Sequence, residues 1–327
     1  MPLVSVIIPL FNGGKYIERT LQSVFMQTFR DFEVIVVDDG SLDNGLEIVK
    51  AFAMDKPDCV KYLTHAGRKN RGIAASKNAG IRRARGEFIA FIDQDDIWNP
   101  VKLETQVVFL QDQEDVSLTY SRVGIVLGEQ DPYEGHISGF VGHGKPHAAR
   151  NMFSELLKEN YIPALTVVAR KEHLLAVGLF DESAPLHHYE DWLLWSKLAY
   201  SHKFYFVPDV LGYYRSHHGS VSAQRLSSGD DFLAEEHYIV ALFHFLLNSE
   251  SVNPHIVHRH LLKRIWLFFL RGRSWGVSAK KLRASGNVLV ASFPTMRSHI
   301  EISLRLASLI PSSVAGFARQ VRRKLKG

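Results

Sequence analysis

Four short apolar segments, each followed by a stretch with helical spacing, constrain the fold of this chain more than any other feature. Leu3–Pro9, Glu33–Val37, Val60–Leu63 and Phe88–Ile92 are rich in β-branched and aromatic residues, as strands buried on both faces are. Strands that alternate with helices join through right-handed crossovers into a parallel sheet. The sequence therefore predicts an α/β fold with a Rossmann-like, mostly parallel but mixed sheet flanked by helices.

The fourth apolar segment ends in carboxylates, because Asp93, Asp95 and Asp96 follow it with only Gln94 between them. Carboxylates this close repel one another and lose hydration unless a cation or polar ligand lies among them. Ligands of open parallel sheets bind beyond the carboxyl ends of the strands, and oxygen donors suit Mg²⁺ or Mn²⁺. A solvated acidic turn that caps the next helix is the alternative, and this segment alone does not decide.

A second acidic pair, Glu190 and Asp191, precedes a helical pattern that begins at Trp192. Negative groups in the first turn of a helix are stabilised by its dipole, which is a purely structural explanation. The functional alternative is a catalytic base that accepts the proton of a sugar hydroxyl. Further along, Arg215 offers a positive charge for phosphate and His217 a metal or phosphate ligand, unless the segment is a surface turn.

The sequence lacks both G-x-G-x-x-G and G-x-x-x-x-G-K-[ST], so neither a dinucleotide fingerprint nor a P-loop is expected. A metal ion is then the candidate for holding phosphates. The predicted small-residue helix near 74–80 carries Lys77, whose side chain is either a donor near the site or part of a solvated face. Residues 128–150 predict an irregular loop, with surface histidines at His136, His143 and His147.

Charge is distributed unevenly along the 327 residues, whose net charge is +5. Residues 261–327 hold fourteen Lys or Arg and one acidic residue, Glu301, which gives +13 there and leaves −8 for residues 1–260. The single cysteine, Cys59, fits a reducing compartment. The chain opens directly on a strand pattern and contains no apolar run of about 18 residues. We therefore expect a cytoplasmic protein, or one peripheral on the inner face of the plasma membrane.

Seven motifs, in this order, make the sequence resemble the family 2 inverting glycosyltransferases of the GT-A fold. They are VSVIIPLFNGGKYIERTLQSV, QTFRDFEVIVVDDGSLD, NRGIAASKNAG, GEFIAFIDQDDIW, GLFDE, EDWLLW and YYRSHHGSVS. The resemblance predicts a nucleotide-sugar-binding catalytic domain at 1–222 and a helical, basic C-terminal region at 223–327. The Q-x-x-R-W motif of processive polysaccharide synthases is absent from the sequence, so a non-processive bacterial enzyme is expected.

The resemblance implies a nucleotide-sugar donor, a UDP-sugar in the first place, and assigns residues to it. Pro9 and Phe11 would contact the base, and Asp39 would bond the edge of the base. Lys77 would contact the base or the diphosphate, although the family often has arginine at this position. Arg215 would neutralise phosphate charge.

The resemblance also implies a metal site and a catalytic base. Asp93 would meet the ribose or the ion, Asp95 would bind Mn²⁺ or Mg²⁺, and His217 would reach the ion or the diphosphate. Glu190 and Asp191 match an acidic motif of the family, and Asp191 is the expected base. Its carboxylate would deprotonate an acceptor hydroxyl that displaces the nucleotide with inversion.

The implied reaction moves one sugar to a hydroxyl of a glycan or lipid-linked acceptor in cell-surface polysaccharide (O-antigen, capsule or exopolysaccharide) biosynthesis. One rival is a sugar nucleotidyltransferase, which releases pyrophosphate rather than nucleoside diphosphate. A second rival is a catalytically inactive scaffold subunit that binds a sugar nucleotide. The complete acidic set argues against the scaffold.

The basic C-terminal region predicts two long helices, near 232–247 and 256–270, and an amphipathic stretch from Val314 to Leu325. Basic amphipathic helices bind anionic membrane surfaces, whereas the structural alternative is a helix packed on the core with a solvated basic face. Nucleic acid is not an expected partner, because the sequence shows no RNA- or DNA-binding module.

Overall fold

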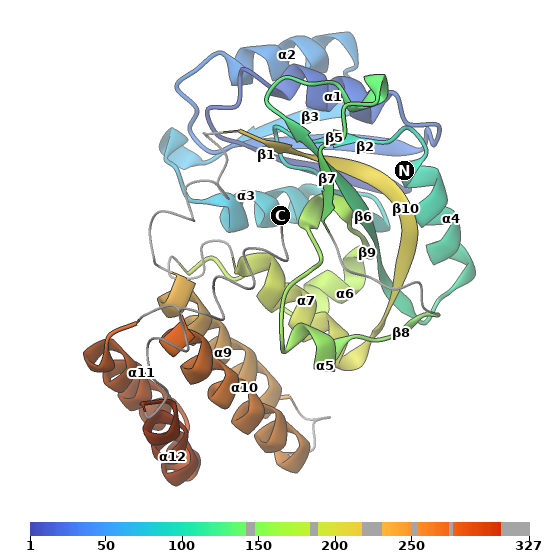
Figure 1. Ribbon diagram of the computed structural model, residues 1–327. Coiled ribbons are helices and arrows are strands. Elements are labelled where there is room, and N and C mark those ends of the chain that lie inside the picture. Colours follow the sequence, from blue (N-terminus) through green and yellow to red (C-terminus); the bar gives the residue numbers. More distant parts are fainter. Residues whose placement is uncertain (142–147, 184–188, 218–230, 250–253, 275–276, 309–327) are drawn as a thin grey trace. The chain divides into compact units, whose positions relative to one another are not determined.

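The structure, a computed structural model, describes residues 1–141, 148–183, 189–217, 231–249, 254–274 and 277–308. The chain divides into two compact units. The first unit holds Met1–Ala184 and Glu190–Ser227, and the second holds Ser228–Gly327 together with Pro185–Tyr189. Figure 1 shows the sheet of the first unit and the helices of the second.

The first unit is built on one mixed sheet, in which ten strands are described. These are β1 (Val4–Leu10), β2 (Phe32–Asp38), β3 (Val60–Thr64), β4 (Phe88–Phe91), β5 (Ile97–Trp98), β6 (Val116–Leu127), β7 (Gly139–Val141), β8 (Arg150–Asn151), β9 (Val168–Arg170) and β10 (Lys203–Ser216). The main order is β3-β2-β1-β4-β9-β6-β10-β5 (Figure 1). The β3–β2, β2–β1, β1–β4 and β6–β10 pairs are parallel, whereas β9 is antiparallel to both neighbours. The expected mostly parallel mixed sheet is confirmed.

Helices cover both faces of this sheet. They are α1 (Ile17–Phe25), α2 (Gly45–Asp55), α3 (Ile73–Arg83), α4 (Lys102–Asp112), α5 (Phe153–Leu156), α6 (Lys171–Ala176) and α7 (Glu190–Ser201). In Figure 1, α1 and α2 lie on one side of β1 and β2, and α3 lies on the other side. Each predicted strand–helix alternation in residues 1–112 is present, with ends that differ by up to three residues from the sequence pattern.

Side chains of β1 alternate between the two faces of the sheet, so this one strand contacts helices on both faces. Val6 and Ile8 belong to a core cluster with Leu21 of α1. Ile7 points to the opposite face, toward Gly80 of α3. A Cβ atom added to Gly80 would lie 2.5 Å from Cγ2 of Ile7. Successive side chains of a strand point to opposite faces. The small-residue helix therefore packs tightly against the sheet at Gly80.

Pro9 lies inside β1, which continues to Leu10. The sequence pattern predicts that the strand ends at Pro9. The Ile7 carbonyl accepts from the Ile92 N–H on the β4 side, and the Leu10 carbonyl accepts from the Asp39 N–H on the β2 side. Because alternate residues of a strand bond to opposite neighbours, Pro9 faces the β4 side. The β1–β4 ladder ends two residues earlier, at Ile7, so the missing N–H of Pro9 removes no ladder bond.

The longest strand, β10, runs parallel to β6 along most of its length. It contains Tyr213 and Arg215, so the surface-turn alternative is wrong for residues 213–216; residues 218–222 of that segment lie outside the described residues. His217 directly follows the end of β10. Residues 128–150 contain β7 and β8 in addition to loops, and His136 in them is exposed. His143 and His147 lie outside the described residues.

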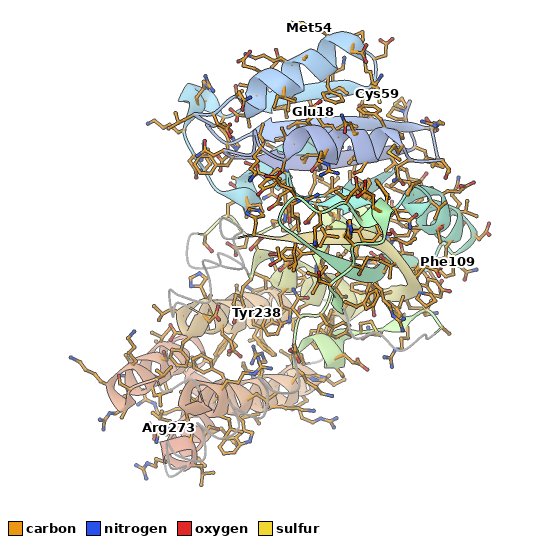
Figure 2. All side chains as sticks on the ribbon, turned by 45° about the horizontal axis from the view of Figure 1, so that its top comes forward. Glu18, Met54, Cys59, Phe109, Tyr238 and Arg273 are labelled. Atoms are coloured by element: carbon orange, nitrogen blue, oxygen red, sulfur yellow. The ribbon has the colours of Figure 1, made fainter. Side chains whose placement is uncertain are left out.

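The second unit consists of helices. Those described are α9 (Asp231–Leu247), α10 (Pro254–Ser274), α11 (Ala279–Ser292) and α12 (Arg297–Ser308). The α10 helix packs on α9 and α12, and α11 packs on α12. Tyr238, which Figure 2 labels, is fully buried, and the Arg264 guanidinium lies 5.2 Å from its ring centroid. The buried Glu235 accepts the Arg271 guanidinium at 3.0 Å and pairs with Arg264 at 2.5 Å.

The two long helices expected near 232–247 and 256–270 are present as α9 and α10, whereas α11 and α12 were not foreseen. The amphipathic stretch from Val314 to Leu325 lies outside the described residues. None of the helices in the described part of the chain is long and apolar enough to cross a membrane.

Candidate active site

The turn after β4 directs one of its three carboxylates inward. Asp96 is 1% exposed, and its Oδ1 atom accepts the backbone N–H of Arg215 at 3.0 Å. Its carbonyl oxygen accepts the Thr20 hydroxyl of α1 at 2.8 Å. Burial and the neighbouring Asp95 raise the pKa of Asp96 well above its usual value. Asp96 therefore fastens the turn to α1 and β10, and leaves Asp93 and Asp95 for a ligand.

Asp95 meets the residue that follows β10. Its Oδ2 atom lies 2.8 Å from Nε2 of His217. The ring of His217 packs on Tyr16, with centroids 4.7 Å apart. Burial raises the pKa of Asp95, the charge of Asp93 adds to this, and the His217 hydrogen bond opposes it. The predicted metal pair, Asp95 and His217, is thus in direct contact.

The oxygen and nitrogen atoms at this turn provide some of the ligands that a divalent ion needs. Among the described residues, no group of three or more His, Cys, Asp or Glu side chains is arranged to hold a metal. However, Asp93 Oδ1 is a buried oxygen that accepts no hydrogen bond from the described part of the chain. Mg²⁺ is commonly bound by one or two carboxylates and completes its shell with waters and phosphate oxygens. Asp93, Asp95 and His217 fit an ion of that kind, completed by a bound diphosphate.

Asp39, at the end of β2, holds the start of α3. Its two carboxylate oxygens accept the backbone N–H groups of Arg71 at 2.6 Å and Gly72 at 2.9 Å. Gly72 has φ of 90°, a left-handed conformation that favours glycine. His65 Nε2 lies 3.6 Å from Asp39 Oδ1. The Asp39 carboxylate, predicted to bond the base, is 4% exposed and already accepts two N–H donors.

The loop after β1 is tied to the acidic turn by Gln94. Its side-chain amide accepts the Phe11 N–H at 2.7 Å and donates to the Phe11 carbonyl at 3.0 Å. A Cβ added to Gly13 would come within 2.3 Å of Gln94 Oε1. Phe11 itself is 43% exposed. The segment predicted to contact the base and the turn predicted to hold the metal are therefore one connected piece of structure.

Arg215 is 1% exposed, and its guanidinium donates hydrogen bonds to backbone carbonyls. It donates to the carbonyl of Asp95 at 3.0 Å, of Gly128 at 2.5 Å and of Gln130 at 3.1 Å. Its Nη2 atom is buried and has no hydrogen-bond partner in the described part of the chain. The arginine thus joins the acidic turn to the connection after β6, and a phosphate contact stays a prediction for it.

Glu190 and Asp191 lie in the first turn of α7, as predicted. Asp191 Oδ1 accepts the Asn160 side-chain N–H at 3.2 Å and the Trp192 backbone N–H at 2.6 Å. Burial raises the pKa of Asp191 to about 7; the charge of Glu190 adds to the shift and Lys77 opposes it. A carboxylate with a pKa near neutrality is suited to accept a proton at that pH.

Lys77 of α3 connects the two acidic groups. Its Nζ atom lies 3.6 Å from Asp93 Oδ1 and 3.9 Å from Glu190 Oε1. The fold thus gathers most of the predicted site residues at one edge of the sheet, from segments that are far apart in the chain. Pro9, Phe11 and Asp39 lie at the neighbouring ends of β1 and β2.

Two residues that organise the site were missed by sequence reasoning: Gln94 bonds the Phe11 backbone, and Tyr16 packs on His217. Asn78, which the sequence offers as a donor beside Lys77, donates to the Phe180 carbonyl. Their partners lie far away in the chain, so local pattern gave no sign of these contacts.

Comparison with known proteins places the chain in a family. Residues 5–168 match the family described as Glycosyl transferase family 2. The putative teichuronic acid biosynthesis glycosyltransferase TuaG of Bacillus subtilis is 31% identical over 227 residues, which cover 68% of this chain and 83% of TuaG. The UDP-Glc:alpha-D-GlcNAc-diphosphoundecaprenol beta-1,3-glucosyltransferase WfaP of Escherichia coli is 29% identical over 259 residues, which cover 76% of this chain and 94% of WfaP.

Solved structures share the fold. TarS 1-349 of S. aureus, in complex with UDP-GlcNAc, aligns with a TM-score of 0.70 at 21% identity over 98% of this chain and 92% of that chain. The mannosyltransferase PcManGT of Pyrobaculum calidifontis, in complex with GDP-Man and Mn²⁺, aligns with a TM-score of 0.54 at 22% identity over 94% and 87% of the two chains. Fold and comparisons together define a glycosyltransferase with the GT-A fold. The chain belongs to glycosyl transferase family 2.

Proposed function

We propose that this enzyme is a metal-dependent inverting glycosyltransferase that moves one sugar from a nucleotide-sugar donor to an acceptor hydroxyl. One observation carries the proposal. The Lys77 ammonium lies 3.6 Å from Asp93, in the turn suited to a metal–diphosphate, and 3.9 Å from Glu190, the neighbour of the proposed base Asp191. A donor held at Asp93 and Asp95 would therefore lie near the first turn of α7, which carries that base.

Each group has a chemical task in this proposal. The Asp191 carboxylate takes the proton of the acceptor hydroxyl as that oxygen attacks the anomeric carbon. The bond to the diphosphate breaks on the opposite side, so a single displacement inverts the configuration. Asp93, Asp95 and His217 would hold a Mn²⁺ or Mg²⁺ ion, which would stabilise the negative charge of the departing diphosphate.

Relatives suggest the substrate class. TarS has been seen with UDP and UDP-GlcNAc, and WfaP is named for UDP-Glc and a diphosphoundecaprenol-linked acceptor. TuaG is named for teichuronic acid biosynthesis. These names support a UDP-sugar donor, a glycan or lipid-linked acceptor and a role in cell-surface polysaccharide biosynthesis. The absent Q-x-x-R-W motif favours transfer of one sugar per encounter.

A donor panel tests the proposed function. The purified protein is heated with UDP-, GDP- and dTDP-sugars, each with and without Mn²⁺. A ligand that binds only the folded state raises the melting temperature, so we expect the largest rise with a UDP-sugar plus Mn²⁺. Slow hydrolysis of that donor should release UDP. Release of pyrophosphate would instead indicate a nucleotidyltransferase, and no stabilisation by any donor would contradict the proposal.

We propose further that the second unit binds an anionic membrane surface. Lys280 and Lys281 are exposed in the first turn of α11, where the helix dipole disfavours cations. On α12, Ile302 is 54% and Leu306 48% exposed. Exposed cations and exposed apolar side chains in one unit are the groups that bind anionic lipid headgroups, with about 1 kcal/mol for each cation near the surface.

Vesicle flotation tests the membrane proposal. The protein should float with vesicles that contain phosphatidylglycerol and stay behind with phosphatidylcholine alone. Lys280→Glu with Lys281→Glu should reduce flotation without harming the helix, since acidic residues suit its first turn. Lys69→Glu with Arg83→Glu changes charge equally at exposed positions of the first unit. Equal loss in both double variants would show only a general charge effect and would refute the assignment to α11.

A further inference from the structure

Lys77 is one of the most deeply buried charged side chains in the site, with 2% exposure. Its Nζ atom lies within ion-pair distance of the carboxylates of Asp93 and Glu190. A buried cation needs carboxylates or other hydrogen-bond acceptors around it, and Asp93 and Glu190 provide these for Lys77.

These neighbours come from two parts of the fold. Asp93 belongs to the turn after β4, and Glu190 begins α7 almost a hundred residues later. Nζ of Lys77 lies between them, 3.6 Å from one carboxylate and 3.9 Å from the other. The ring of Phe180 lies on a further side, with Nζ 5.5 Å from its centroid. The ammonium group is thus enclosed by protein groups.

The residue next to Lys77 fastens the same two regions independently. Asn78 donates from Nδ2 to the Phe180 carbonyl at 2.8 Å and accepts the Phe180 N–H at Oδ1 at 3.0 Å. Nδ2 also lies 2.8 Å from Glu182 Oε1. Residues 178–182 precede α7, so α3 holds the approach to α7 through Asn78 and its first turn through Lys77.

We propose that Lys77 is a positioning residue, which ties the turn of Asp93 to the first turn of α7 and so sets the place and charge of the catalytic base. The inference rests on the proposed function and replaces the expected contact of Lys77 with the donor. Its cation screens the carboxylates from one another across the bridge. Replacement of Lys77 is therefore expected to lower kcat, which depends on the base Asp191, more than it raises the donor KM.

The charges near Asp191 predict the direction in which its pKa should shift when Lys77 is replaced. Glu190 and Asp93 disfavour its ionised form, Lys77 favours it, and Asn160 donates a neutral hydrogen bond. If ionised Asp191 is the active form, transfer rises with pH through its pKa. Lys77→Met removes a charge that favours the ionised carboxylate, and a nearby opposite charge typically shifts the pKa of a carboxyl group by one unit or more. The pH at which kcat rises should therefore increase by about one pH unit.

The experiment compares kcat against pH for three variants of the full chain. Lys77→Met should move the rise of kcat to higher pH and lower kcat more than it raises the donor KM. Glu190→Gln removes an unfavourable charge, so its rise of kcat should move to lower pH. Arg83→Met removes an exposed cation of the same helix and should change neither. A rise of kcat that Lys77→Met leaves at the same pH, with donor affinity lost instead, would show that Lys77 binds the donor and would overturn the proposal.

A double variant tests the bridge itself. If Lys77 acts on α7 through Glu190, then Lys77→Met should cost a smaller factor in kcat when Glu190→Gln is already present. Equal factors in both backgrounds would refute the bridge. Should Lys77→Met fail to fold, Glu190→Gln still tests it, because an unchanged kcat after loss of one end would be incompatible with positioning. Failure of the proposed function is distinct, since the wild-type protein would then release no nucleoside diphosphate.

Discussion

Replacement of Asp191 by asparagine is expected to slow sugar transfer by a factor of about 10²–10⁴, the range that a positioned base contributes. Asparagine has the same shape and keeps an oxygen that can accept the Asn160 and Trp192 N–H groups. It cannot take the proton of an acceptor hydroxyl. The measurement is the steady-state rate of UDP release with donor and acceptor present, and the affinity for UDP, measured by calorimetry, should stay within about twofold of wild type.

The pKa of Asp191 adds two checks on this prediction. With a pKa of about 7, wild-type transfer should rise with pH through neutrality. The folded protein also keeps the proton of Asp191 to a higher pH than the unfolded chain does. Any stability gained from that proton is complete below pH 4 and lost as pH rises through about 7, so Asp191→Asn should melt above wild type at pH 8. The exposed Asp58 provides a control, and Asp58→Asn should change none of these quantities. Undiminished transfer in Asp191→Asn would exclude this residue as the base.

Replacement of Asp95 by asparagine is expected to weaken the binding of Mn²⁺ with UDP and to lower transfer on the order of a hundredfold or more, since a bound ion contributes several kcal/mol of transition-state stabilisation. Asparagine can still contact His217, but it lacks the negative charge that attracts the ion. The readout besides activity is calorimetric titration with Mn²⁺ in the presence of UDP. We expect the binding constant to fall at least about tenfold.

Two comparisons separate this effect from a general disturbance. Binding of uridine without metal should be the same in Asp95→Asn and wild type, because the segment around Phe11 is held by Gln94 and not by Asp95. The far-UV circular dichroism spectrum should also be unchanged. A variant that binds Mn²⁺ and UDP as tightly as wild type would remove Asp95 from the metal site.

Much of the first unit could be predicted because its signals are local. The apolar character of β1, β2 and β4 and the helical spacing after each strand are properties of ten or so consecutive residues. Parallel pairing followed from the alternation itself, since parallel strands need crossovers. The acidic turn was predictable for the same reason, because its aspartates follow directly on a buried strand.

Other elements were missed because distant partners decide them. The segment around Tyr213 reads as a turn in isolation, yet it is a strand because β6, almost a hundred residues earlier, offers it a parallel ladder. The helices α11 and α12 were also missed; α11 packs on α9 and α12, and α12 packs on α10. Asp96 looked equivalent to Asp95 in sequence, but its burial against Arg215 gives it a structural task.

The sequence by itself determined the fold class and the chemistry available to the chain: a parallel sheet with carboxylates at its strand ends and an acidic pair on a later helix. Only the tertiary structure decided which of these groups meet. Asp93, Lys77 and Glu190 come from a turn and two helices that packing brings together. A local pattern records which face of an element is apolar. The partner that covers that face depends on side-chain fit and charge across the whole chain, and this selects the neighbours of a buried cation.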